Sequence, residues 1–473
     1  MLFPTIQFAV FFPIVFVLSW LLRPYPTRWK VLMVIASYVF YGWWDWHYVF
    51  LLGGSTIANQ VFARLIAPSR EPVRRVLLIA AVVVNLGALA YFKYYGFFAT
   101  SVVNTLSDMG VKVSPPLFQI ILPIGISFFT FQALSYVVDT YRGKVEPVPF
   151  LDFATYLSFF PHLVAGPIVR ASEFLPQLKE RPDPRYLDGS YAFRLIVAGM
   201  FKKVVISSYL AGAIVDKVFA APANHSSLEI LFAIYGYAIQ IYADFSGYTD
   251  IAIGLALLLG IRFPPNFNAP YTALSLQDFW RRWHMTLSRF LRDYLYIPLG
   301  GNRGSRFQTY RNLMLTMLIG GLWHGAAWTF VVWGGIHGTG LAIEHWRSDR
   351  REQLGLPEPE QTPRRMILEW LITFNVVCLA WVFFRSPNFD TAFTMLHRLF
   401  TAWGPAPLVT PLLLLTIMAM LASQFVPEDA IRTIQARFSR WPVAAQGLTL
   451  AGCFFVINAL GPVGVAPFIY FQF

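Results

Sequence analysis

The chain has 473 residues, of which 56% are hydrophobic, 17% aromatic and only 13% charged. An ordinary soluble domain carries roughly 25% charged residues, so this composition excludes a soluble globular enzyme, and its high apolar content excludes a disordered chain. The formal net charge of +12 is typical of basic loops that stay in the cytoplasm beside anionic lipid headgroups. We therefore predict an all-α, multi-pass membrane protein that contacts membrane lipids and has no nucleic-acid partner.

Apolar runs recur along the whole chain, and a helix needs about 20 such residues to cross a bilayer. We expect helices at residues 5–22, 31–44, 48–65, 76–92, 117–138, 150–168, 193–219, 228–243, 247–261, 313–343, 366–384, 408–425 and 444–460. With broken segments included, these runs predict a bundle of roughly 11 to 13 transmembrane or re-entrant helices in a single integral-membrane domain, 1–473. The basic stretches 23–30, 64–75 and 142–144 alternate as the positive-inside rule requires if the N-terminus lies outside. The polar stretch 347–365 is expected to be a flexible loop.

The first polar cluster between apolar runs is ADFSGYTD, which contains Asp244, Ser246, Tyr248 and Asp250. It is interpreted either as a kinked helix satisfied by its own hydroxyl groups or as part of a substrate or ion path. Gly247 is expected to interrupt the helix, and such breaks at membrane depth are tolerated only where the backbone is buried or lines a cavity. The middle of the chain is therefore the predicted region of the site.

A basic polar segment follows at residues 275–311. Ser275 with Asp278 three residues later indicates a helix start, and apolar residues then recur at helical spacing, which predicts one amphipathic helix. Its basic residues serve either as topology and lipid-headgroup charges or as receptors for the phosphates of an anionic, nucleotide-based carrier, because arginine forks match phosphate oxygens. The residues predicted for donor binding are Arg281, Arg282, Arg289, Arg292 and Asn302.

Three histidines lie in this region in apolar surroundings. His284 shares a helical stripe with Trp280 and Leu287, which is also the pattern of a structural, hydrogen-bonded histidine. His324 and His337 lie in a run of 32 residues, 312–343, that has no Asp, Glu, Lys or Arg. An ionisable group in such a run is costly and indicates function, and apolar surroundings favour the uncharged imidazole as a base. No histidine pair has i, i+4 spacing and no HExxH motif occurs, so no metal site is predicted.

Five ordered segments carry a family resemblance. They are LPIGISFFTFQALSYVVDTYRG (122–143), FFPHLVAGPIVR (159–170), DFSGYTDIAIG (244–254), DFWRRWHMTLSRFLRDYLYIPLGGNR (278–303) and GLWHGAAWTFVVWGGIHG (321–338). Together they resemble the membrane-bound O-acyltransferase (MBOAT) family, in particular its bacterial alginate O-acetyltransferase branch. The resemblance covers nearly the whole chain, with a signature core at about residues 117–345.

The resemblance implies the roles of several residues. The histidine of the W-H-G segment, His324, is the expected catalytic residue, and the W-x-x-W-H segment supplies the second one, His284. A helical bundle is expected to surround a central tunnel through the membrane. The polar residues expected to line this tunnel are Asp244, Ser246, Tyr248 and Trp323.

The resemblance also implies the reaction and its partners. The expected enzyme is an O-acyltransferase of the bacterial cytoplasmic (inner) membrane, with cytosolic acetyl-CoA as donor and no permanently bound cofactor. The acceptor is a hydroxyl group on the extracytoplasmic side, where a separate acetyltransferase or esterase-like protein completes O-acetylation of an alginate-like exopolysaccharide. The alternatives are transfer of D-alanyl or other acyl groups to a cell-wall polymer, and a secondary transporter in which Asp244 and Asp250 bind coupling ions.

Overall fold

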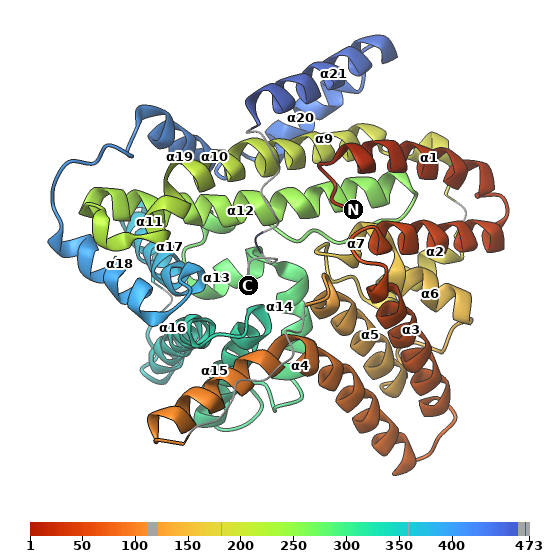
Figure 1. The fold of residues 1–473 in the computed structure, drawn as a ribbon, viewed down its shortest axis with the longest axis horizontal. Helices are drawn as coiled ribbons and strands as arrows, with labels where there is room; N and C mark the ends of the chain where they lie inside the picture. The colour runs from red at the N-terminus through yellow and green to blue at the C-terminus, as the bar shows by residue number, and fades with distance from the viewer. Residues whose placement is uncertain (112–121, 181, 358, 462–468, 470–473) are drawn as a thin grey trace. The chain divides into compact units, whose positions relative to one another are not determined.

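The computed structural model describes residues 1–111, 122–180, 182–357, 359–461 and 469, and all regular secondary structure in these residues is helical (Figure 1). The all-α prediction is therefore confirmed. The chain divides into two compact units, residues 1–193 with 251–264 and residues 194–250 with 265–473. The predicted signature core, 117–345, contributes to both units. Its first residues, 117–121, lie outside the described part of the chain.

The first unit holds the N-terminal helices, most of which match predicted apolar runs. They are α1 (Ile6–Leu22), α2 (Pro26–Gly42), α3 (His47–Ile66), α4 (Val73–Asp108), α5 (Ile126–Tyr141), α6 (Phe150–Ser158), α7 (Phe160–Leu163), α8 (Ala171–Phe174), η1 (Leu175–Leu178) and η2 (Pro184–Tyr186). Helices α3, α4 and α5 pack against one another, while α2 packs between α1 and α6. The run expected at 150–168 is not one helix, because it breaks into α6, α7 and an irregular turn around Gly166 and Pro167.

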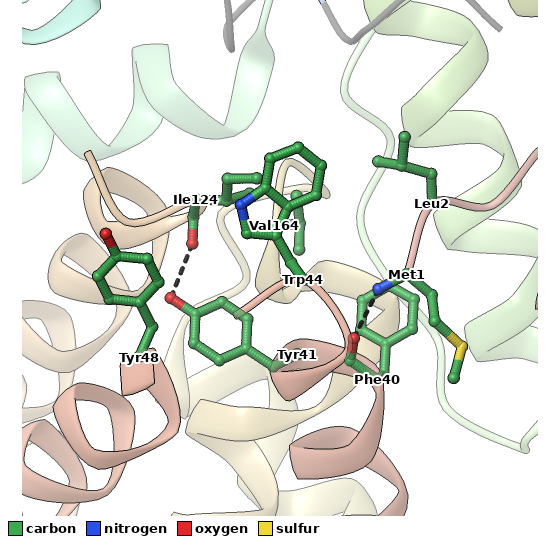
Figure 2. A pocket seen from close by; sticks show the side chains of 8 residues that line it. All are labelled: Met1, Leu2, Phe40, Tyr41, Trp44, Tyr48, Ile124 and Val164. Carbon is green, nitrogen blue, oxygen red and sulfur yellow. Dashed lines mark hydrogen bonds between the residues drawn. The ribbon is translucent and has the colours of Figure 1, made fainter. Parts of the chain in front are cut away.

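A small pocket lies near the chain start in this unit (Figure 2). The Met1 ammonium group donates a hydrogen bond to the Phe40 carbonyl oxygen at 2.6 Å. The Tyr41 hydroxyl group donates to the Ile124 carbonyl oxygen at 2.8 Å. The first bond joins the chain start to α2, and the second joins α2 to the segment before α5. No residue predicted for the functional site lines this pocket.

The second unit holds most of the remaining helices. They are α9 (Gly189–Met200), η3 (Phe201–Ser207), α10 (Ser208–Leu210), η4 (Ala211–Val215), α11 (Asp216–Ala220), η5 (Pro222–Asn224), α12 (Ser227–Leu258), η6 (Pro270–Thr272), α13 (Leu276–Arg282), α14 (Met285–Leu291), η7 (Arg292–Tyr296), α15 (Arg306–His324), α16 (Trp328–Gln353), α17 (Pro363–Arg385), α18 (Phe389–Thr401), α19 (Pro411–Ser423), α20 (Glu428–Phe438) and α21 (Val443–Leu460). The boundary between the units falls inside α9 and α12. Helix α16 extends to Gln353, so the loop predicted at 347–365 is partly helical.

Six helices in the described residues are long and apolar enough to cross a membrane, or seven if the pair α19 and α20, bent by 93°, forms one span. Only 17% of the most apolar window of α4 and 6% of that of α21 are buried inside the protein. Apolar helix surface exposed to this extent requires a lipid environment, because water would not solvate it favourably. The protein is thus an integral membrane protein. Fewer helices can cross alone than the 11 to 13 segments expected, because several apolar runs form shorter or broken helices.

Gly247 does not break its helix, contrary to the sequence interpretation. Helix α12 continues through it, so the two runs expected at 228–243 and 247–261 form one helix. A Cβ atom at Gly247 would lie 2.7 Å from the Gly199 carbonyl oxygen and 3.1 Å from the Lys203 nitrogen. The glycine therefore allows α12 to approach the α9–η3 helix closely.

Helices α15 and α16 form a tightly packed hairpin, visible as the adjacent teal helices in Figure 1. The apolar run 313–343 bends between His324 and Trp328, so it forms two helices where one was expected. A Cβ atom at Gly321 would clash with the Phe330 carbonyl oxygen, and one at Gly334 would clash with the Met317 carbonyl oxygen. These glycines serve close backbone packing.

A matched pair of alanine substitutions tests this packing. We expect Gly334→Ala to lower stability by about 1–3 kcal/mol, because the added methyl group meets rigid backbone. The neighbouring substitution Gly335→Ala is the control, since its Cβ atom would lie 3.8 Å from the nearest side-chain carbon, of Leu318. Thermal unfolding in detergent micelles should rank Gly334→Ala below the wild type and Gly335→Ala at or above it. Equal midpoints for the two variants would contradict the close packing.

Candidate functional site

His324 is the last residue of α15, directly before the bend into α16. Its side chain is buried, and its imidazole lies within 5.2 Å, between ring centroids, of Trp323, Trp333 and Phe384. The prediction that His324 lies in apolar surroundings is therefore confirmed. These rings belong to α15, α16 and α17, and they shield the imidazole from bulk solvent.

His284 lies between two short helices, and not within the single amphipathic helix that the sequence pattern predicts. Helix α13 ends at Arg282, α14 begins at Met285, and His284 adopts a left-handed backbone conformation with φ 41°. The helix start at Ser275 is as expected, because its hydroxyl oxygen accepts a hydrogen bond from the Asp278 backbone at 3.0 Å. A left-handed conformation at a non-glycine residue is uncommon and occurs preferentially at functional sites.

Asn266 anchors His284, and sequence analysis did not identify it. The Asn266 side-chain oxygen accepts hydrogen bonds from the Thr286 backbone N–H at 3.2 Å and from the Thr286 hydroxyl group at 2.8 Å. The same oxygen lies 3.1 Å from Nδ1 of His284. Because this oxygen can only accept, Nδ1 must carry the proton, and Nε2 of the neutral imidazole presents a lone pair.

Trp323 brings the two predicted catalytic histidines into one cluster. Its ring centroid lies 4.9 Å from that of His324 and 6.1 Å from that of His284. His284 also contacts Phe245 of α12, with the two rings perpendicular and their centroids 4.7 Å apart. The site thus combines α12, the α13–α14 break and the α15–α16 hairpin, all within the second unit.

Aromatic rings of α16, of α17 and of the α13–α14 break complete this cluster. Trp333 of α16 lies 5.9 Å from Trp381 of α17, and Trp381 lies 5.1 Å from Trp283. His337 packs against Trp333 at 4.9 Å. We call these rings, with His284, Trp323 and His324, the histidine–tryptophan cluster. Pairs of aromatic rings at such separations favour a rigid arrangement, which suits a site that must hold reacting groups in place.

The predicted tunnel residues of α12 form a second polar group beside this cluster. Lys203 of η3 donates to the Asp244 carboxylate, and Lys202 donates to Asp250 at 2.5 Å and to the Ser246 hydroxyl group at 3.0 Å. Tyr248 is buried on the same helix. Sequence analysis did not identify the two lysines. Since both carboxylates are paired with lysine, the structure offers no support for a coupling-ion site at Asp244 and Asp250.

The predicted donor-binding residues occupy a different setting. Arg282 pairs with Asp278 at 2.8 Å and Arg292 pairs with Asp293 at 2.7 Å. Arg281 and Asn302 are exposed, while Arg289 is half-buried. The pairing of two arginines with nearby carboxylates reduces the net positive charge that this segment offers to a phosphate group.

Comparisons with known proteins identify the class of enzyme. The family model described as MBOAT, membrane-bound O-acyltransferase family, matches residues 76–389. The protein named "Probable alginate O-acetylase AlgI" of Pseudomonas aeruginosa is 43% identical over 378 residues, which are 79% of this chain and 70% of that protein. The peptidoglycan O-acetyltransferase of Helicobacter pylori is 40% identical over 424 residues, 83% of this chain and 78% of that protein. The teichoic acid D-alanyltransferase of Streptococcus thermophilus is 28% identical over 320 residues, 63% of this chain and 77% of that protein.

The apolar helical architecture and these matches define an integral-membrane acyl-transfer enzyme. The chain belongs to the membrane-bound O-acyltransferase family, and it is an O-acyltransferase. The predicted family and the predicted class of enzyme are thus confirmed. The matched region, 76–389, contains the complete histidine–tryptophan cluster.

Proposed function

We propose that this enzyme transfers an acetyl group from cytosolic acetyl-CoA to a hydroxyl acceptor on the extracytoplasmic side of a bacterial inner membrane. The buried pairing of His324 with His284 across Trp323 carries the proposal. Relatives that O-acetylate alginate or peptidoglycan, by their names, support acetyl as the acyl group. An alginate-like exopolysaccharide is the proposed final acceptor.

The proposed chemistry is one proton transfer coupled to one acyl transfer. The acceptor hydroxyl oxygen attacks the thioester carbonyl carbon, the carbon–sulfur bond breaks, and an ester and coenzyme A form. His324 takes the hydroxyl proton and returns it to the leaving thiolate, a role worth roughly 10²–10⁴-fold in rate. Because Asn266 holds the proton on Nδ1 of His284, the lone pair on Nε2 can accept the single hydroxyl hydrogen while the acceptor enters, before that hydrogen turns to His324.

The donor is proposed to enter from the cytosolic side. Residues 281–311 carry the arginines expected there, and the exposed Arg281 and half-buried Arg289 are the best placed to meet coenzyme A phosphates. Arg282 and Arg292 must exchange their carboxylate partners to take part. A central tunnel would connect this side with the histidine–tryptophan cluster and the acceptor.

A partner protein is proposed on the extracytoplasmic side. A sugar polymer cannot enter a narrow channel surrounded by lipid, because its many hydroxyl groups would lose water without replacement partners. The acetyl group is small enough to cross instead. An acetyltransferase or esterase-like protein would then accept it and complete transfer to the polysaccharide.

D-alanyl transfer to a cell-wall polymer is the second candidate. It is favoured by the 28% identity to a teichoic acid D-alanyltransferase over 63% of this chain. The higher identity to O-acetyltransferases, 43% and 40%, favours acetyl.

Purified protein in sealed vesicles tests the proposal. With labelled acetyl-CoA on one side and an acceptor polymer with candidate partner proteins on the other, we expect labelled polymer to form only when the chain and a partner are both present. Efficient labelling without a partner would contradict the partner requirement. Labelling only with both substrates on the same side would contradict the route across the membrane.

A further inference from the structure

His337 is a buried histidine of the cluster to which the proposed mechanism gives no role. Its side chain is fully buried on α16, 13 residues after His324. Its ring stacks on Phe279 at 6.0 Å with an interplanar angle of 10°, and packs edge-on against Trp280 at 5.2 Å. With Trp333 of α16 at 4.9 Å, three rings from α13 and α16 therefore fix the orientation of this imidazole.

One hydrogen bond determines which nitrogen of His337 carries the proton. The Trp280 indole N–H donates to Nδ1 of His337 at 3.3 Å. An indole nitrogen is a donor only, so Nδ1 accepts and Nε2 of the neutral ring carries the hydrogen. His337 and His284 are thus held in opposite tautomers, one presenting a donor at Nε2 and the other a lone pair.

The donor at Nε2 has no hydrogen-bond partner within the described residues, and the same holds there for the indole N–H of Trp333. A buried donor without a partner is energetically costly, and a ligand or a catalytic role is one explanation for such a group. Trp333 contacts both His337 and His324, each at 4.9 Å between ring centroids. The two donors therefore belong to the surroundings of the proposed base.

We propose that His337 donates a hydrogen bond from Nε2 to the carbonyl oxygen of the acyl donor. When the acceptor hydroxyl attacks, this oxygen gains negative charge, and a fixed donor stabilises it without reorganisation. A lone-pair acceptor such as His284 Nε2 suits the hydroxyl group, and a donor such as His337 Nε2 suits the carbonyl group. Trp280 is the positioning residue, because its N–H keeps the proton on Nε2. The proposal rests on the proposed function.

Three substitutions separate a donor role from packing. His337→Phe keeps a planar ring and removes the donor, so we expect kcat for acetyl transfer to fall about 100-fold with little change in KM for acetyl-CoA. His337→Gln keeps both an acceptor and a donor and should restore most of kcat. Trp280→Phe frees the tautomer and should give an intermediate loss. The control is His345→Phe on the same helix, where Nδ1 of His345 lies 3.2 Å from the Asp349 carboxylate. This variant should keep wild-type kcat.

The outcomes distinguish this proposal from the proposed function. Wild-type kcat in folded His337→Phe would overturn the donor role, as would equal losses in the Phe and Gln variants with matching losses of thermal stability. Wild-type protein that does not use acetyl-CoA in the same assay contradicts the proposed function instead. An active wild type, a weak Phe variant and a largely rescued Gln variant are the results expected.

Discussion

Replacing His324 with alanine should reduce acyl transfer by at least about 10²–10⁴-fold, the typical contribution of a general base. The variant should still insert into the membrane and remain folded. His324 ends α15 and contacts Trp323, Trp333 and Phe384 as one ring among many, so its loss removes little of the packing. Polymer acetylation by cells that produce the variant, compared at equal protein level, is the measurement.

Two features sharpen this test. His345→Ala on α16 removes a histidine with an exposed edge outside the cluster and should leave acetylation unchanged. A monodisperse size-exclusion peak in detergent establishes that the His324→Ala variant is folded. Normal acetylation by the folded variant would remove His324 from the mechanism.

Replacing Lys203 with methionine should lower the stability of the protein more than Gly334→Ala or Lys202→Met does. The side chains of Lys203 and Asp244 are only 4% and 3% exposed, so the substitution leaves a buried carboxylate without its cation. Removing one partner of a buried ion pair typically costs about 3–5 kcal/mol. The Asp244 carboxylate also accepts hydrogen bonds from the Ser207 hydroxyl group at 3.3 Å and the Ile469 backbone at 2.8 Å, so helix η3 and the Ile469 backbone should loosen together.

The neighbouring lysine is a matched control. Lys202 pairs with Asp250, and their side chains are 16% and 22% exposed, so Lys202→Met should cost less. The double substitution Lys203→Met with Asp244→Asn should recover part of the lost stability, because a neutral amide can still accept from Ile469 and carries no charge. In detergent micelles, Lys203→Met should have the lowest thermal midpoint, and both Lys202→Met and the double variant should unfold at higher temperatures than Lys203→Met. A Lys203→Met midpoint equal to that of the wild type would show that the pair does not stabilise the fold.

The sequence predicted the helical class and the apolar helices well, since long hydrophobic runs have few alternatives in a bilayer. Helices α1, α3 and α17 begin and end within a few residues of the expected positions. Tight packing between helices was harder to foresee. Gly247, for example, was interpreted as a break because a single sequence does not show which neighbour approaches a glycine.

The predicted histidines were placed correctly in apolar surroundings, but their local geometry was not predictable. Periodicity assigned His284 to a continuous helix, whereas the chain changes direction there with a left-handed residue. Asn266 holds that turn from 18 positions away in the sequence, and no local pattern indicates such a contact. Lys202 and Lys203 were missed for the same reason. They lie in an apolar helix and acquire their roles only where α12 supplies the two carboxylates.

The central claim is that the histidine–tryptophan cluster transfers acyl groups from a thioester donor. The most direct test incubates purified protein in detergent with labelled acetyl-CoA and measures release of coenzyme A, with and without a small hydroxyl acceptor. The account predicts release that the acceptor accelerates and that His324→Ala abolishes. Release that persists unchanged in His324→Ala, or a wild-type protein that never cleaves the thioester, would contradict it.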